Sequence, residues 1–137
     1  MALVIDASVA MGWFIESQAT PISRAALVAV NRESGIVPAH FGIEMARALR
    51  NRERRSLMSA EATDSSLLEL RTLRLHQDSA PTLDIVARIV GLARHHQLRV
   101  ADAAYLELAL RQRLLLATAD AALALAAASA GVNLLTA

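Results

Sequence analysis

The sequence predicts an α/β domain with a mostly parallel central sheet of about five short strands, flanked by helices. Short apolar runs alternate with longer amphipathic segments along the chain, an order typical of parallel sheets whose strands are connected by helices. Hydrophobic residues make up 55% of the 137 residues but aromatic residues only 3%, so alanine, leucine and valine must supply the core. These residues favour helices and thin strands over an aromatic-rich β-sandwich. With no repeat or linker in the pattern, we expect one domain over residues 1–137.

The expected strands are short apolar runs. The first, Leu3–Ile5, contains two β-branched residues and ends at an acid, Asp6, as a buried strand would. The other expected strands cover residues 36–37, 75–77, 114–117 and 132–135.

Helices are expected between these strands, because apolar residues recur there at helical spacing. Ser8 and Ser59 are candidate N-caps, Pro21 is suited to a first helical turn, and Gly35 follows an expected helix end. The expected helices cover residues 8–16, 21–33, 41–54, 59–73, 83–96, 102–113 and 120–129.

The composition excludes several classes of function. The chain has no cysteine, which excludes a disulfide scaffold, a zinc–thiolate site and a thiol nucleophile, and fits the cytoplasm. All 14 basic residues are arginine, which excludes chemistry that requires lysine. The N-terminus lacks the basic segment of a signal peptide. The most apolar stretch, residues 114–130, is rich in alanine and interrupted by Asp120, so we expect no membrane span.

Four acids occupy corresponding places in the predicted fold. Asp6 and Asp120 follow predicted strands, Asp102 is expected to open a helix, and Glu44 lies near the start of another. In open parallel sheets the carboxyl ends of the strands form the edge that binds ligands. If these helices begin at the same edge, the four carboxylates converge.

Converging carboxylates repel one another unless a cation neutralises them, and their hard oxygen ligands suit Mg²⁺ or Mn²⁺. Such an ion can activate water and stabilise the charge that develops on a phosphate during displacement. The sequence therefore suggests metal-dependent phosphodiester hydrolysis. The expected catalytic and metal-binding residues are Asp6, Glu44, Asp102 and Asp120.

Each acid also has a structural interpretation. Asp102 and Asp120 are placed as N-caps, and Glu44 would be favoured by the helix dipole. Asp6 is harder to explain in this way, because an acid that ends a buried strand has few structural roles. Taken together, the four positions favour function.

Five segments, in order along the chain, carry a resemblance to a known family. They are Val4–Ala10 with Trp13 and Phe14, Pro38 with Phe41 and Glu44–Arg50, Val100–Ala109, Leu116–Asp120 with Leu123, and Val132–Leu135. Together they resemble the motifs of PIN-domain proteins, specifically the VapC toxins of bacterial toxin–antitoxin pairs.

The resemblance implies a compact α/β endoribonuclease that depends on Mg²⁺ or Mn²⁺ and is inhibited by a small VapB-type antitoxin. The four acids match its acidic site, and Ser8 and Thr118 match positions whose hydroxyl groups support that site. Two positions depart from the pattern. Arg47 stands where many relatives carry asparagine, and Gln97 stands at a helix end where glycine is frequent, so we expect a strained turn before Asp102.

Two surfaces are candidate interfaces. Arg47, Arg50 and Arg54 share one helical face and could bind either an RNA backbone or the acids of an antitoxin. The leucine-rich helix over residues 59–73 has more apolar residues than one core face needs, which favours a homodimer or an antitoxin groove.

The strongest alternative is a PIN-like module that binds RNA or protein without cutting it. A phosphorelay receiver is disfavoured because the chain has no lysine, and a phosphate-cradling nucleotide binder because no suitable glycine-rich loop occurs.

Overall fold

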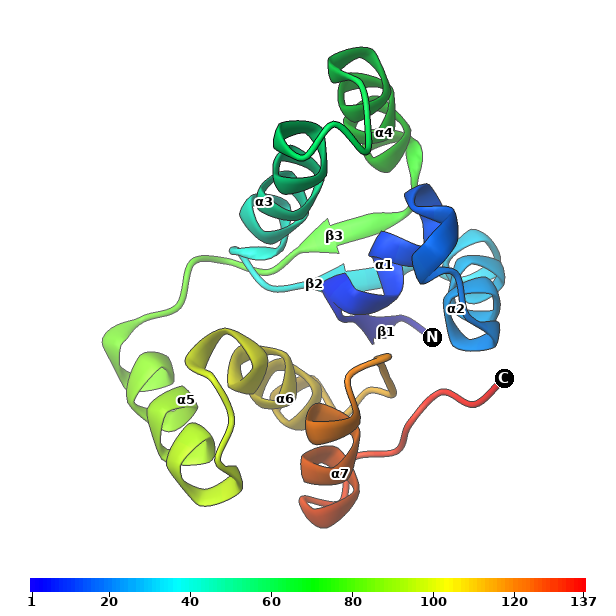
Figure 1. The fold of residues 1–137 in the computed structure, drawn as a ribbon. Coiled ribbons are helices and arrows are strands. Elements are labelled where there is room, and N and C mark those ends of the chain that lie inside the picture. Colours follow the sequence, from blue (N-terminus) through cyan, green and yellow to red (C-terminus); the bar gives the residue numbers. More distant parts are fainter.

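The computed structural model describes all 137 residues and has a parallel four-stranded sheet with the order β3-β2-β1-β4 (Figure 1). The strands are β1 (Leu3–Ile5), β2 (Gly35–Val37), β3 (Leu75–Gln77) and β4 (Leu116–Ala117). The predicted α/β class and parallel sheet are confirmed. The expected last strand is reduced to one parallel bridge between Leu116 and Leu134, and β4 begins later than predicted.

Seven α-helices flank the sheet, as the amphipathic segments predict. They are α1 (Ala7–Phe14), α2 (Pro21–Arg32), α3 (Phe41–Arg54), α4 (Ala60–Thr72), α5 (Leu83–His96), α6 (Val100–Gln112) and α7 (Ala121–Ser129), with a 3₁₀ turn at Glu16–Gln18.

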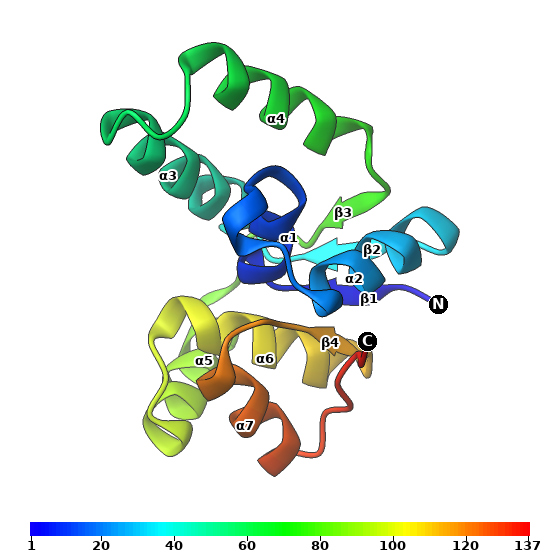
Figure 2. The same ribbon diagram turned by 45° about the vertical axis from the view of Figure 1, so that its right-hand side comes forward.

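The helices form two groups on either side of the strands. Helices α5, α6 and α7 lie together on one side, and α1 to α4 on the other (Figure 2). Helix α6 packs on β1 and β4, whereas α5 and α7 pack on α6. On the other side α2 packs on the same two strands, α1 lies against α2 and α3, and α4 reaches the rest of the fold mainly through α3.

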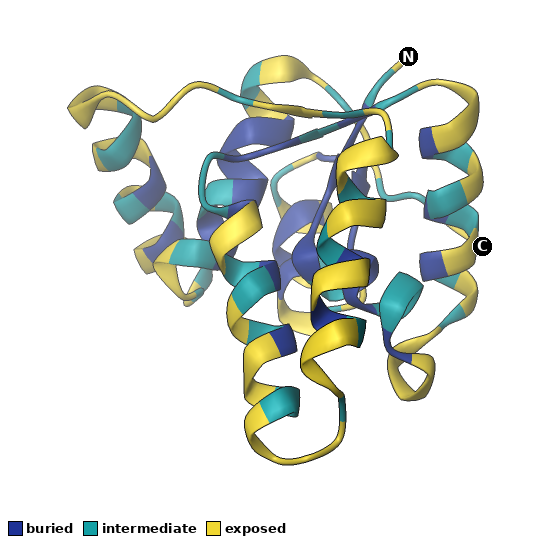
Figure 3. Ribbon diagram, turned by 90° about the horizontal axis from the view of Figure 1, so that it is seen from above, coloured by how far each residue is buried: buried dark blue, intermediate teal, exposed yellow.

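The core follows from this layering. Buried residues gather in the central strands and the helices against them, while the outer turns of the helices are exposed (Figure 3). Val4, Ile5 and Leu116 are completely buried in the strands, and α3 and α6 contribute Met45 and Leu106. None of the helices is both long and apolar enough to cross a membrane.

The start of α2 and the end of α5 each depend on particular residues. Helix α2 begins with a capping box in which Thr20 and Ser23 satisfy each other's backbone N–H groups. Helix α5 ends at Gln97, whose backbone has φ 54° and ψ 46°. This left-handed conformation costs a residue other than glycine about 1–2 kcal/mol, so the expected strain before Asp102 is present.

Candidate active site

Asp6 lies directly after β1 and is 4% exposed. Its Oδ2 accepts hydrogen bonds from the hydroxyl groups of Ser8 at 2.6 Å and Thr118 at 2.7 Å. The Ser8 hydroxyl in turn accepts the backbone N–H of Ala119 at 3.0 Å. The prediction that Ser8 caps the first helix was wrong, because α1 begins at Ala7 and the Ser8 side chain points to Asp6 instead. Both hydroxyl groups thus hold one oxygen of a buried carboxylate.

The segment after β4 brings Asp120 to the same end of the sheet. The backbone N–H of Asp120 donates to the Thr118 hydroxyl at 3.0 Å, which links it indirectly to Asp6. Asp120 is also the N-cap of α7, where its Oδ1 accepts the N–H of Ala122 at 3.0 Å. The structural role expected for Asp120 is therefore present, and its other carboxylate oxygen has no hydrogen-bond partner in the protein.

The electrostatic surroundings of Asp6 connect three of the acids. Burial raises the pKa of Asp6 to about 6, although the hydrogen bonds from Ser8 and Thr118 act in the opposite direction. The negative charges of Asp102 and Glu44 raise it further. These two carboxylates therefore lie close enough to Asp6 to oppose its ionisation.

Glu44 lies in the first turn of α3, as predicted, and has two side-chain partners. The hydroxyl group of Tyr105, in α6, donates a hydrogen bond to Glu44 Oε1 at 2.5 Å. His40 Nε2 lies 3.1 Å from both Glu44 Oε1 and the carbonyl oxygen of Ala101. Because a carbonyl can only accept, Nε2 must carry the proton that the two oxygens share. These contacts join the start of α3 to the start of α6.

The pKa values in this group reflect those contacts. Burial opposes the ionisation of Glu44, but the hydrogen bonds from His40 and Tyr105 prevail and lower its pKa. The hydrogen bond with Glu44 raises the pKa of His40 against the effect of burial. Burial, together with the bond to Glu44, raises the pKa of Tyr105 and keeps its hydroxyl a donor. Glu44 is thus held as an ionised acceptor.

Asp102 is the third residue of α6, and the expectation that it opens this helix was wrong. The helix begins at Val100 with Arg99 as its N-cap residue, so Asp102 lies within the first turn. Its side chain is 10% exposed, and its Oδ2 accepts a hydrogen bond from Arg99 Nε at 3.0 Å. Asp102 therefore has no capping role, although the helix dipole favours an acid at this position.

The four acids share one end of the sheet, but no three of them are arranged as ligands of a metal ion. Instead, Asp6 is held by hydroxyl groups, Glu44 by a tyrosine and a histidine, and Asp102 by Arg99. The donor set consists of carboxylate oxygens, whose chemistry fits Mg²⁺ or Mn²⁺. Asp6 Oδ1 has no protein partner and is not enclosed. That oxygen is free for a cation.

Three residues of this site were not predicted as part of it. Tyr105 is completely buried in a helix of alanine and leucine, and a buried tyrosine hydroxyl usually requires a partner. Arg99 precedes Asp102 by three residues, a spacing at which helical side chains meet. His40 was noted only as a residue near Glu44, and its bonds to Glu44 and Ala101 emerge from the tertiary structure.

The arginines predicted to bind RNA or antitoxin lie on α3. Arg47, Arg50 and Arg54 are all exposed on the helix that carries Glu44. Arg50 Nη1 donates to Glu53 at 2.7 Å within the same helix, so part of its charge is already compensated.

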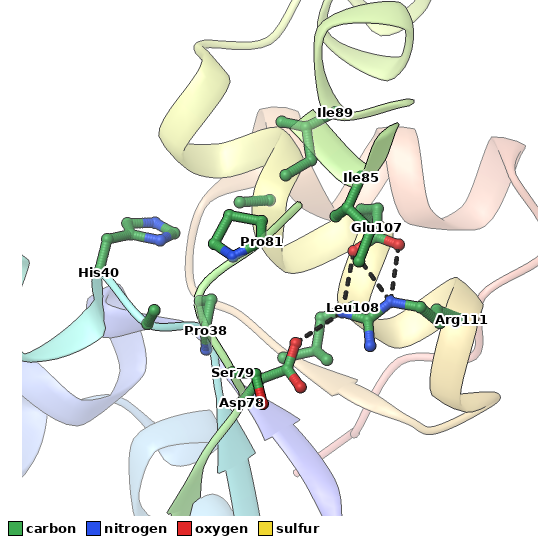
Figure 4. Close-up of a pocket in the computed structure, with 12 residues that line it drawn as sticks. Pro38, His40, Asp78, Ser79, Pro81, Ile85, Ile89, Glu107, Leu108 and Arg111 are labelled. Atoms are coloured by element: carbon green, nitrogen blue, oxygen red, sulfur yellow. Dashed lines mark hydrogen bonds and ion pairs between the residues drawn. The ribbon is translucent and has the colours of Figure 1, made fainter. Parts of the chain in front are cut away.

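A cavity of about 120 Å³ lies beside His40, between the segments that follow β2 and β3 and helices α5 and α6 (Figure 4). Pro38, Pro81 and Ile89 contribute apolar walls. At the other end Arg111 bonds to both Asp78 and Glu107, and Arg88 lies 3.9 Å from Glu107, so two arginines balance two acids. We find no unpaired polar group there that points to a ligand.

Comparisons with known proteins agree with this architecture. The family model of the PIN domain matches residues 3–129. The fold is similar to the crystal structure of PAE2754 from Pyrobaculum aerophilum, with a TM-score of 0.70 and 21% identity over 92% of this chain and 84% of that one. It is also similar to FitAcB from Neisseria gonorrhoeae, with a TM-score of 0.66 and 19% identity over 98% of this chain and 96% of that one. No curated protein sequence matches.

Proposed function

The chain belongs to the PIN domain family, whose members are generally nucleases, and we propose that it is a Mg²⁺- or Mn²⁺-dependent endoribonuclease. Its substrate would be the phosphodiester backbone of RNA. The proposed metal-binding and catalytic residues are Asp6, Glu44, Asp102 and Asp120, in one nuclease domain over residues 1–137.

The observation that carries the proposal is the state of Asp6. It is almost fully buried, and Asp102 and Glu44 raise its pKa. A buried acid beside two other acids destabilises the fold when it ionises, unless a cation offsets the repulsion. One oxygen of Asp6 is oriented by Ser8 and Thr118, and the other is left without a protein partner. This is the arrangement expected of a metal ligand with a supporting shell.

Each residue of the site would then have its own role. Ser8 and Thr118 keep Asp6 in one orientation, while Tyr105 and His40 hold Glu44 ionised at the start of α3. A bound divalent cation would supply an activated water and stabilise the charge that develops on the phosphate. The exposed arginines of α3 would hold the flanking phosphates.

We extend the proposal to the biological role on the strength of the VapC-like motifs. The protein would act as the toxin of a VapBC-type pair and be inhibited by a VapB-type antitoxin bound near Arg47, Arg50 and Arg54. Helix α4 packs Leu67 and Leu70 against the core and leaves Leu68 60% exposed. A homodimer through this helix therefore rests on its leucine-rich sequence and on the VapC-like motifs.

Cleavage of total cellular RNA by the purified protein tests the enzymatic proposal. With Mg²⁺ or Mn²⁺ we expect discrete cuts that EDTA abolishes. Asp6→Asn should reduce cutting to background, because it removes a ligand charge while keeping an oxygen for Ser8 and Thr118. Asp84→Asn is the matched control, since Asp84 is an exposed acid in the first turn of α5.

Three results would change the proposal. Undiminished cutting by Asp6→Asn would exclude Asp6 as an essential ligand, and full activity of a folded Asp102→Asn variant would exclude Asp102. RNA binding without any cleavage, regardless of metal, would favour the alternative of a non-catalytic PIN-like module that binds RNA or protein.

A further inference from the structure

Arg99 occupies an unusual position at the rim of the acidic site. It is the N-cap residue of α6, but its side chain makes no capping hydrogen bond. Its side chain is 80% exposed, yet Nε donates at 3.0 Å to an oxygen of Asp102, whose side chain is only 10% exposed. The exposed guanidinium of Arg99 thus contacts the nearly buried carboxylate of Asp102.

Arg99 is also close to two further acids of the site. The hydrogen bond with Asp102 raises the pKa of the Arg99 guanidinium, and the charges of Asp120 and Glu44 add to this effect. These three acids come from different elements, α6, the start of α7 and α3. The guanidinium therefore acts as a counter-charge for a group of acids and not for Asp102 alone.

The contact is poorly explained as a stabilising ion pair. Exposed pairs contribute about 0–1 kcal/mol, and only one of the three guanidinium nitrogens is used here. Both terminal nitrogens, which form the fork that suits a phosphate, have no partner in the protein. The side chain is thus free to take a second anion without breaking any other contact.

We propose that Arg99 is an exchangeable counter-ion of the active site. Without metal it neutralises Asp102 and so competes with a divalent cation for that carboxylate. When RNA binds, the guanidinium transfers to a backbone phosphate next to the bond that is cut. This inference rests on the proposed function, because it takes Asp102 as a metal ligand.

The charges favour such an exchange. The Arg99 guanidinium would leave Asp102 if the four acids held a divalent cation, because the two positive charges repel each other. An incoming phosphate then offers two oxygens to the free fork at the mouth of the site. Arg99 therefore weakens cation binding in the free protein and strengthens RNA binding. A residue with a purely structural role would not act on the two ligands in opposite directions.

The test compares Arg99→Gln with Arg94→Gln, a matched change at an exposed arginine of α5. Mn²⁺ affinity is measured on the metal-free protein by electron paramagnetic resonance. We expect Arg99→Gln to bind Mn²⁺ about 3- to 5-fold more tightly, which corresponds to the loss of one competing exposed ion pair. Arg94→Gln should leave the affinity unchanged.

RNA affinity is measured with a fluorescein-labelled single-stranded RNA of mixed sequence, with Asp6→Asn present in every protein to prevent cutting. Arg99→Gln should weaken binding and make the slope of log K against log salt concentration shallower by about 0.7, as for one lost phosphate contact. Arg99→Lys should restore the salt slope more than the affinity, because lysine keeps the charge but not the fork.

The possible failures can be told apart. A wild-type protein that binds no Mn²⁺ and cuts no RNA overturns both the proposed function and the role of Arg99. If the wild type binds Mn²⁺ and cuts RNA, but Arg99→Gln leaves Mn²⁺ affinity unchanged or weaker, only the role of Arg99 is overturned. An unchanged salt slope would likewise exclude the transfer to phosphate.

Discussion

Asp6 combines a buried position with a carboxyl group whose pKa is about 6, against 3.8 for an ordinary aspartate. The folded protein therefore binds this proton more tightly than the unfolded chain does. The resulting stabilisation is complete below about pH 4 and is lost as the pH rises through about 6. Above that pH the ionised carboxylate destabilises the metal-free fold, and the proposed cation would offset this loss of stability.

We predict that Asp6→Asn stabilises the metal-free protein at pH 7.5 by up to about 3 kcal/mol, because the amide keeps an acceptor oxygen and removes the buried charge. The variant should also lose the fall in stability between about pH 4 and 6. Urea unfolding in EDTA across this range measures both effects. Asp84→Asn should follow the wild type, and an Asp6→Asn curve that also follows it would mean that Asp6 is not destabilising.

The short helix α1 packs closely against α2. Gly12 makes this approach possible. A Cβ atom at Gly12 would lie 2.7 Å from the carbonyl oxygen of Gln18 and from Ser23 Oγ. Ser23 is itself buried in the capping box that begins α2, so neither neighbour can move away easily.

Gly12→Ala should therefore destabilise the protein by about 1–3 kcal/mol through overpacking. Gly91→Ala is the matched control, because it lies within α5 and a Cβ there meets nothing within 4 Å. The control should stabilise the fold by roughly 0.5–1 kcal/mol, since alanine favours helix. Thermal unfolding of both variants measures the contrast. Equal effects at the two sites would show that the α1–α2 contact tolerates an extra methyl group.

Arg111 links parts of the whole molecule that are distant in sequence. It donates to Glu107 within α6 and to Asp78 after β3, at 2.9 Å and 2.6 Å (Figure 4). Hydrogen bonds with Glu107 and Asp78 raise the pKa of Arg111 above its ordinary value. Glu107 is 4% exposed, and its other cationic neighbour, Arg88, is 3.9 Å away. The segment after β3 is thereby held against α6.

Removal of Arg111 alone should lower the free energy of unfolding more than removal of Arg111 and Glu107 together. Arg111→Ala leaves Glu107 buried without its main counter-charge, and we expect a loss of about 3–5 kcal/mol. The double variant Glu107→Leu with Arg111→Met should recover most of that loss, because the buried charge of Glu107 is removed and the remaining acid, Asp78, is partly exposed to water. Arg94→Ala serves as the exposed control in the same chemical unfolding series. A loss below about 1 kcal/mol for Arg111→Ala would mean that water replaces the guanidinium.

Much of the fold was predictable because its determinants are local. Helical spacing, prolines and glycines placed all seven helices and the first four strands within a few residues. The errors lie at boundaries. Serine and aspartate at such places usually cap, so the sequence predicts a cap at Ser8 and a helix start at Asp102, and the structure contradicts both predictions. Which residue caps a helix depends on what its side chain meets across the fold.

The α/β class, the order of the elements and the four candidate acids follow from the amino-acid sequence alone, because they depend on periodicity and on positions at strand and helix ends. The contacts of each acid depend instead on the packed fold. Thr118 reaches Asp6 across 112 residues, and Tyr105 reaches Glu44 across 61. Such pairings depend on how strands and helices pack side by side. That packing is set by burial of the whole core, and no local pattern encodes it.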